Sequence, residues 1–204
     1  CDPEIYMEEK PTSDPYWDRI CTPCDEEYDW DRNFDWAGEA NRPNIFDEVE
    51  SIEPVIDPTQ VQNIAIDVGD PDVELDAYFI PSHGLYGEVA NTTIIYNHGR
   101  FAGIDHYLPR VQLLHALGYN VFTWDYRGYG KSQPSTYADT VDWMSDALAA
   151  YDAALNQAPD PNKIIIYGQS VGGHPTGEMG DNRPACAIVF ESAALSNTSK
   201  VEDN

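Results

Sequence analysis

Ser170 is the central residue of the segment GQSVG at residues 168–172. This G-x-S-x-G spacing is typical of a nucleophile elbow, in which a serine is lifted above a sheet on a strained turn between a strand and a helix. Glycine is needed two residues before and after the serine, because side chains there would strike neighbouring backbone. The apolar run IIIY directly precedes the segment and supplies the strand. The pattern favours acyl transfer by Ser170 over an ordinary glycine turn.

A second segment, NHGR at residues 97–100, follows an earlier apolar run. The oxyanion of acyl transfer is held by the backbone N–H after the nucleophile and by a second N–H from such a loop. The sequence therefore predicts an oxyanion hole made by the N–H groups of Val171 and Arg100, with Phe101 as the next candidate. His98 is predicted to support this loop through a hydrogen bond and not to act as the base.

Strands and helices alternate around these segments. Two strands are predicted at residues 61–68 and 73–79, joined by a turn at Gly69. Apolar runs at residues 92–96, 120–124, 163–167 and 185–190 predict buried strands, with Cys186 a buried strand residue. Spacings of three and four predict two helices, the first with Leu108, Val111, Leu114 and Leu117 on one side and the second with Val141, Met144, Leu148, Tyr151 and Leu155. The expected fold class is α/β, with a sheet that is parallel after its first antiparallel hairpin.

Charge separates an acidic extension, residues 1–58, from a core at residues 59–204. The extension also contains tryptophan and other aromatic residues, so we expect it to pack along the core. The whole chain has 36 acidic and 11 basic residues and a net charge of −25, which would repel nucleic acid. Two interpretations of the acidity stay open: adaptation to salt, and a solvating surface that keeps the protein soluble.

The four cysteines are Cys1, Cys21, Cys24 and Cys186. A first residue that is cysteine resembles a mature bacterial lipoprotein, which predicts an exported protein tethered to the cell-envelope membrane through lipidated Cys1; an arbitrary fragment start is the alternative. In an exported protein the pair Cys21 and Cys24 is more typical of a local disulfide than of a metal site. Zinc requires four ligands, and the sequence has no second C-x-x-C or paired histidines, so no metal is expected.

Four motifs in order resemble the alpha/beta-hydrolase superfamily, in particular its serine-aminopeptidase-like and esterase-like members. They are YNHG at residues 96–99, WDYRGYGKS at 124–132, YGQSVGG at 167–173 and VFES at 189–192. The resemblance covers residues 61–197 and implies acyl transfer through a Ser, His and Asp triad without metal or organic cofactor. It also implies structural roles for Asp125, Arg127 and Ser132.

Two features depart from the family pattern. Pro175 and several glycines follow the elbow, which predicts a short helix on which His174 is structural. The triad order in this fold is Ser, then acid, then His, yet no histidine follows the late acids Glu191, Glu202 and Asp203. The chain is therefore expected to be the N-terminal portion of such a hydrolase, lacking the last strands, with a C-terminal continuation that completes the triad.

Two functions remain open. The first is a serine hydrolase of small-molecule carboxylic esters or related acyl substrates, inactive or weakly active as this chain alone. The second is a non-catalytic acidic surface or binding module on a hydrolase scaffold, because a fold does not by itself establish activity.

The salt interpretation of the acidity is testable by thermal unfolding. If the acidity is a salt adaptation, the unfolding temperature should rise between low and molar salt, because salt screens the repulsion between surface carboxylates. Circular dichroism across a salt series measures this. A flat or falling curve would remove the salt-adapted interpretation.

Overall fold

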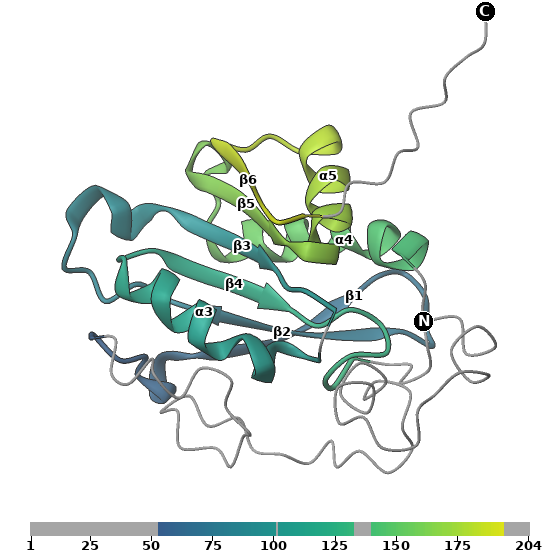
Figure 1. The fold of residues 1–204 in the computed structure, drawn as a ribbon, viewed down its shortest axis with the longest axis horizontal. Coiled ribbons are helices and arrows are strands. Elements are labelled where there is room, and N and C mark those ends of the chain that lie inside the picture. Colours follow the sequence, from purple (N-terminus) through teal and green to yellow (C-terminus); the bar gives the residue numbers. More distant parts are fainter. Residues whose placement is uncertain (1–52, 101, 133–139, 194–204) are drawn as a thin grey trace, which may run out of the picture.

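The computed structural model describes residues 53–100, 102–132 and 140–193 (Figure 1). Cys1, Cys21, Cys24 and Phe101 lie outside the described residues, so lipidation, the cysteine pair and the alternative oxyanion donor stay predictions. The boundary at residue 58 also stays a prediction. In the described part of the chain, no helix combines the length and the apolar character needed to cross a membrane.

A six-stranded sheet forms the centre of the structure, in the order β1-β2-β4-β3-β5-β6. Strand β2 runs antiparallel to both of its neighbours, and the remaining strands pair in parallel. The predicted α/β sheet, parallel after an antiparallel hairpin, is confirmed. The strands are β1 (Gln62–Asp67), β2 (Glu74–Ile80), β3 (Thr93–Asn97), β4 (Asn120–Trp124), β5 (Ile164–Gln169) and β6 (Ala187–Glu191).

Helices cover both faces of this sheet (Figure 1). Helix α3 (Ile104–Ala116) packs on one face, and α4 (Thr140–Gln157) and α5 (Gly173–Asn182) pack on the other. Because successive residues of a strand point to opposite faces, Ile94 and Val121 join the α3 side of the core while Ile95 and Phe122 join the α4 side. Short 3-10 helices occupy Pro58–Gln60, Gly87–Asn91, Pro161–Lys163 and Ser170–Gly172.

The buried face of α3 is confirmed at Leu108, Val111 and Leu114, whereas the buried face of α4 differs from the predicted one. Leu117 caps α3 and is 53% exposed, so it does not extend the buried row. On α4 the predicted Met144, Leu148 and Leu155 are only partly buried. Tyr151 is buried as predicted, and the other α4 side chains in the apolar core are Trp143, Ala147, Ala150 and Ala154. Alanine has little apolar surface, but it lets a helix approach a sheet closely, which a search for large apolar residues misses.

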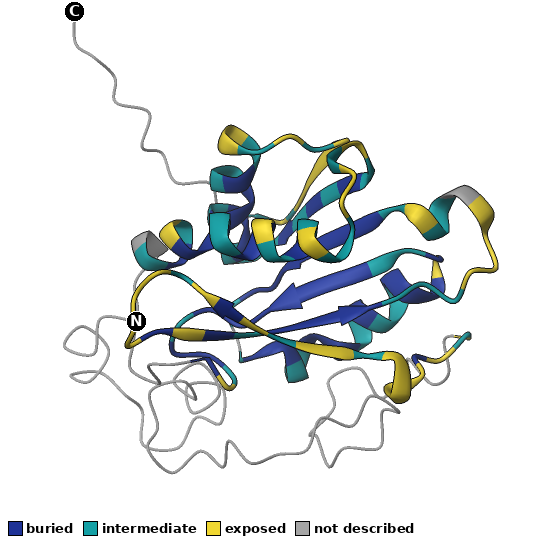
Figure 2. Cartoon of the chain, turned by 180° about the vertical axis from the view of Figure 1, so that it is seen from behind, coloured by how far each residue is buried: buried dark blue, intermediate teal, exposed yellow. Residues whose placement is uncertain are grey.

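Strand β6 is an exposed edge strand, which corrects the predicted buried strand at residues 185–190. Ile188, Val189 and Phe190 are all exposed, Phe190 to 43%, whereas the central strands are buried (Figure 2). Cys186 precedes β6 and is a free, exposed cysteine, so its predicted burial is wrong. The cause is position, because β6 pairs only with β5 and its other edge is open among the described residues.

Residues just before β1 contact helix α3. Ile56 is 3% exposed, within the apolar cluster on the α3 side. Its N–H donates a hydrogen bond to Gln112 Oε1 at 3.1 Å, and Gln112 Nε2 donates to the Pro54 carbonyl at 2.9 Å. The described end of the acidic extension is thus fixed to the core by both apolar and polar contacts.

Protonation of His115 should destabilise the fold. His115 is buried at the end of α3, and its ring lies 5.3 Å from that of His83. Burial lowers the pKa of His115, and His83 lowers it further. The unfolded chain therefore binds more protons than the folded one as the pH falls below about 6.5, and the free energy of unfolding falls with it. Urea unfolding at pH 7.5 and pH 5.5 measures this loss.

His115→Phe keeps an aromatic ring but cannot titrate, so its free energy of unfolding should fall less over the same pH interval. Equal losses in the two proteins would show that His115 is not the group responsible.

Candidate active site

Ser170 lies on a tight turn between β5 and α5. Strand β5 ends at Gln169, Ser170 begins the 3-10 turn, and α5 follows at Gly173. The φ angle of Ser170 is 54°, in the left-handed region that residues other than glycine rarely occupy. Such strain persists only where the surrounding structure imposes it, and it is common at active sites. The predicted elbow backbone is confirmed.

The two elbow glycines are required by close contacts. A Cβ atom added to Gly172 would lie 2.1 Å from the Asn97 carbonyl oxygen, and one added to Gly168 would lie 2.5 Å from the Gly172 carbonyl oxygen. Both obstacles are backbone atoms, which cannot turn away as a flexible side chain can. The steric reason predicted for these glycines is confirmed, and the elbow is packed directly against the end of β3.

Asn97, the last residue of β3, joins three elements beneath the elbow. Its Oδ1 accepts a hydrogen bond from Trp124 Nε1 of β4 at 2.7 Å, and its Nδ2 donates to Thr176 Oγ1 of α5 at 2.8 Å. The residue is fully buried. The sequence analysis missed this role, although a polar residue at the end of a buried strand was a usable signal.

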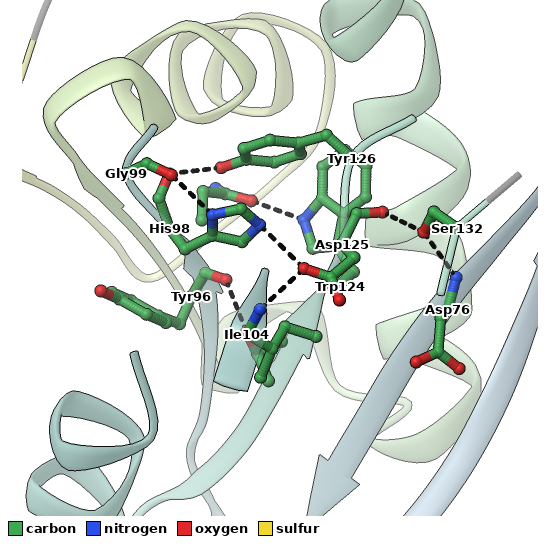
Figure 3. Close-up of polar contacts among 11 residues, drawn as sticks. Asp76, Tyr96, His98, Gly99, Ile104, Trp124, Asp125, Tyr126 and Ser132 are labelled. Carbon is green, nitrogen blue, oxygen red and sulfur yellow. Dashed lines mark hydrogen bonds and ion pairs between the residues drawn. The ribbon is translucent and has the colours of Figure 1, made fainter. Parts of the chain in front are cut away.

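His98 supports the loop that follows β3 (Figure 3). Its ring lies between those of Tyr107 and Tyr126, at centroid distances of 5.3 and 4.2 Å. Nδ1 lies 2.7 Å from the Gly99 carbonyl oxygen, and Nε2 lies 3.2 Å from Asp125 Oδ1. Both ring nitrogens therefore face groups of the protein, and the ring is fully buried. This arrangement fits the supporting role predicted for His98 and leaves it unavailable as a base.

Asp125 is the buried partner of His98. Its Oδ1 also accepts the N–H of Ile104, the first residue of α3, at 2.8 Å. Burial raises the pKa of the Asp125 carboxyl, and the hydrogen bond from His98 opposes that shift. The backbone of Asp125 is held as well, because its carbonyl accepts from Ser132 Oγ at 2.6 Å, and the same Oγ accepts the N–H of Asp76 at 2.9 Å.

The loop after Asp125 is also held in place by close contacts with its neighbours. Gly130 has a φ of 51°, and a Cβ there would lie 1.8 Å from Asp125 Oδ2. Arg127 forms a bidentate pair with Asp146 of α4, with both N···O distances 2.6 Å. Asp125, Arg127 and Ser132 thus each join neighbouring segments of the fold, consistent with structural roles.

The predicted oxyanion donors lie on adjoining segments. Val171 follows Ser170 in the 3-10 turn. Gly172 faces the carbonyl oxygens of Asn97 and His98, and Arg100 comes two residues after His98 in the same loop. Their function as donors stays a prediction.

The described histidines do not form a catalytic triad with Ser170. Ser170 Oγ has no hydrogen-bond partner among the described residues. His83 and His115 pack together near the C-terminal end of α3, where His83 Nε2 lies 3.4 Å from the Ala116 carbonyl oxygen. His174 is on α5, where burial lowers its pKa and the charge of Arg100 lowers it further. In the described part of the chain, no three His, Cys, Asp or Glu side chains lie close enough together to hold a metal ion.

Comparisons with known proteins agree with this geometry. Residues 88–202 match the family model described as serine aminopeptidase, S33. The uncharacterized protein YfhR of Escherichia coli K12 is 28% identical over 144 residues, which are 69% of this chain and 50% of that protein. The alpha/beta hydrolase domain-containing protein WAV2 of Arabidopsis thaliana is 30% identical over 128 residues, 61% of this chain and 40% of that protein. The chain thus spans half the length of the E. coli relative.

Solved structures share the fold. The Pyrococcus furiosus esterase Pf2001 aligns with a TM-score of 0.54 at 23% identity, covering 67% of this chain and 52% of that one. The dienelactone hydrolase-like promiscuous phosphotriesterase P91, from metagenomic libraries, aligns with a TM-score of 0.53 at 23% identity, covering 66% of this chain and 59% of that one. At these identities the likeness establishes the fold alone.

Replacing Gly172 by alanine should disrupt the elbow. The new Cβ would collide with the Asn97 carbonyl, so the turn and the end of β3 must separate, at a cost of about 1–3 kcal/mol in the free energy of unfolding. Chemical denaturation measures the loss.

Gly177→Ala is the control, because Gly177 lies in α5, the helix that directly follows Gly172, with no atom within 4 Å of an added Cβ. Alanine there should be neutral or stabilising by up to about 1 kcal/mol. Equal effects of the two substitutions would contradict the close contact as the reason for Gly172.

Proposed function

The chain belongs to the serine aminopeptidase S33 family of the alpha/beta-hydrolase superfamily, and from this membership we propose that it is a serine hydrolase of carboxylic esters or related acyl substrates. The observation that carries the proposal is the strained backbone of Ser170, at φ 54°, on the turn between β5 and α5. This conformation presents a serine hydroxyl above the carboxyl ends of the strands, where a substrate carbonyl can reach it.

The proposed reaction is acyl transfer through Ser170. Its Oγ attacks the carbonyl carbon while the hydroxyl proton passes to a base, and the N–H groups of Val171 and Arg100 stabilise the resulting oxyanion. The tetrahedral intermediate collapses, the C–O bond to the alcohol breaks, and the alcohol leaves with the proton from the base. Water then attacks the acyl-serine by the same route, releasing the acid and restoring the Ser170 hydroxyl.

The base and the acid that orients it are proposed to lie outside the described residues. The free Ser170 Oγ supports this, since an assembled triad hydrogen-bonds its serine to the histidine. The length of the E. coli relative also supports it, because the match to this chain covers 50% of that protein.

A continuation of the chain beyond β6 is the proposed source of these groups. The open edge of β6 and its exposed Ile188, Val189 and Phe190 support this, because a row of apolar side chains beside unpaired backbone is a template for a further strand. A parallel strand added there would bring its carboxyl end to the same edge of the sheet as Ser170.

The nucleophile is testable by covalent labelling of a longer protein that includes the continuation. A fluorophosphonate should attach to Ser170, detected as a mass adduct on its peptide, and Ser170→Ala should abolish it. Ser192→Ala is the matched control, because Ser192 also has a positive φ, 46°, at the end of a strand, and its replacement should leave labelling intact. A folded protein that carries no adduct at Ser170 would favour a non-catalytic binding module.

Turnover of a p-nitrophenyl ester should separate the 204-residue chain from that longer protein. Without a base, only the roughly 10³ to 10⁴-fold acceleration over water from the oxyanion hole and binding is expected to remain. The longer protein should reach an ordinary enzyme rate and lose it with Ser170→Ala. Full turnover by the 204-residue chain alone would instead place the base among its own histidines.

A further inference from the structure

Arg100 differs from the other arginines that the structure describes. Arg110, Arg127 and Arg183 each pair with a carboxylate, at 2.6, 2.6 and 2.8 Å. Arg100 forms no ion pair or hydrogen bond with any of the carboxylates in the described part of the chain. A guanidinium that the surrounding carboxylates do not neutralise keeps its full capacity for an external anion.

Arg100 lies on the loop that packs against the nucleophile elbow. The preceding loop packs on the elbow, because a Cβ on Gly172 would lie 2.1 Å from the Asn97 carbonyl oxygen and 2.7 Å from that of His98. Asn97 also hydrogen-bonds Thr176 of α5 at 2.8 Å. Arg100 therefore follows directly on a segment that packs against the elbow and the first turn of α5.

His174, on that first turn, is the second group, and a ligand-binding role would replace the structural one that the sequence predicts for it. Its ring is half-buried, and Nδ1 is turned into the protein without a hydrogen-bond partner among the described residues, so a ligand would be reached through Nε2. The positive charge of Arg100 contributes to the lowered pKa of His174, after burial, so the two side chains lie within electrostatic reach of each other. His174 is then neutral at neutral pH, and a neutral imidazole offers one N–H donor.

We propose that Arg100 and His174 bind a carboxylate group of the substrate, so that the preferred substrates are half-esters of short dicarboxylic acids. The guanidinium matches a carboxylate with two parallel N–H···O bonds, and His174 can donate a third. This inference rests on the proposed function, because it takes Ser170 as the residue that attacks the ester carbonyl. The backbone N–H of Arg100 is the predicted oxyanion donor, so a carboxylate on its side chain must lie a short distance from that carbonyl.

A carboxylate is favoured over a phosphate by the charge of the whole chain. With a net charge of −25, the protein repels an anion in proportion to the charge on that anion. A carboxylate carries one negative charge, whereas a phosphate monoester carries about 1.5 to 2 at neutral pH. The single positive charge of one arginine neutralises a carboxylate more completely than it neutralises a phosphate monoester.

Binding of monomethyl glutarate to the 204-residue chain tests the inference without chemistry. Titration followed by calorimetry at low salt should give saturable binding that Arg100→Gln weakens about tenfold or more, as expected for the loss of a charge-assisted bidentate pair. His174→Phe should weaken binding less. Arg183→Gln is the matched control, because it removes the same charge from an exposed pair with Asp152 and should leave the affinity nearly unchanged.

Three results would overturn the inference: no binding to the unaltered chain, equal losses in Arg100→Gln and Arg183→Gln, or tighter binding of inorganic phosphate than of monomethyl glutarate. The first two would exclude the site, and the third would replace the carboxylate by a phosphate.

Turnover by the longer protein separates this inference from the proposed function. The ratio of kcat/KM for the p-nitrophenyl half-ester of glutaric acid to that for p-nitrophenyl butyrate should fall about tenfold in Arg100→Gln. An unchanged ratio would overturn the inference while Ser170-dependent turnover still stands. Turnover that survives Ser170→Ala would overturn the proposed function, and the binding experiment would still decide whether Arg100 holds a carboxylate.

Discussion

The buried carboxylate of Asp125 is the constraint on which the geometry around Ser170 depends. Through its backbone and side chain it contacts β2, the start of α3 and, by way of His98, the loop that carries Arg100 (Figure 3). That loop in turn packs on Gly172 of the elbow. The relative position of the nucleophile and the predicted oxyanion donor is therefore fixed by the buried side chains of Asp125 and His98.

Burying this carboxylate is unfavourable unless other groups compensate the loss of water. The compensation comes from the N–H of Ile104, which donates to Oδ1 at the N-terminus of a helix, where the helix dipole favours negative charge. The His98 ring adds to it, because its Nε2 lies 3.2 Å from the same oxygen. The tyrosines stacked on His98 exclude water from the pair. Leaving a buried polar group without its partner costs about 1–3 kcal/mol, because its desolvation is no longer offset. The same contacts that position the loop therefore make it sensitive to substitution.

The parts of this structure that could be predicted from the sequence are those fixed by short-range sterics. Apolar runs located the strands, and the glycines around Ser170 located the elbow, because a tight turn excludes a Cβ whatever surrounds it. The buried face of α4 could not be predicted from large apolar residues, since Ala147 and Ala150 face the core while Met144 and Leu148 stay partly exposed. The exposure of Cys186 depends on the position of β6 at the edge of the described sheet, and the role of Asn97 depends on three elements that meet only in the fold.

Two electrostatic effects of opposite sign act at the site, over different distances. The summed negative charge of the chain disfavours the approach of an anion from solvent, and salt screens this repulsion over a Debye length of about 10 Å at 0.1 M. The proposed contact between Arg100 and a carboxylate acts over hydrogen-bond distance, well inside this screening length, so salt weakens it less. Moderate salt therefore reduces the barrier to approach more than it reduces the attraction in the bound state. An acidic surface and an anion-binding arginine are then compatible, because the surface governs the approach of the anion and the arginine governs its retention.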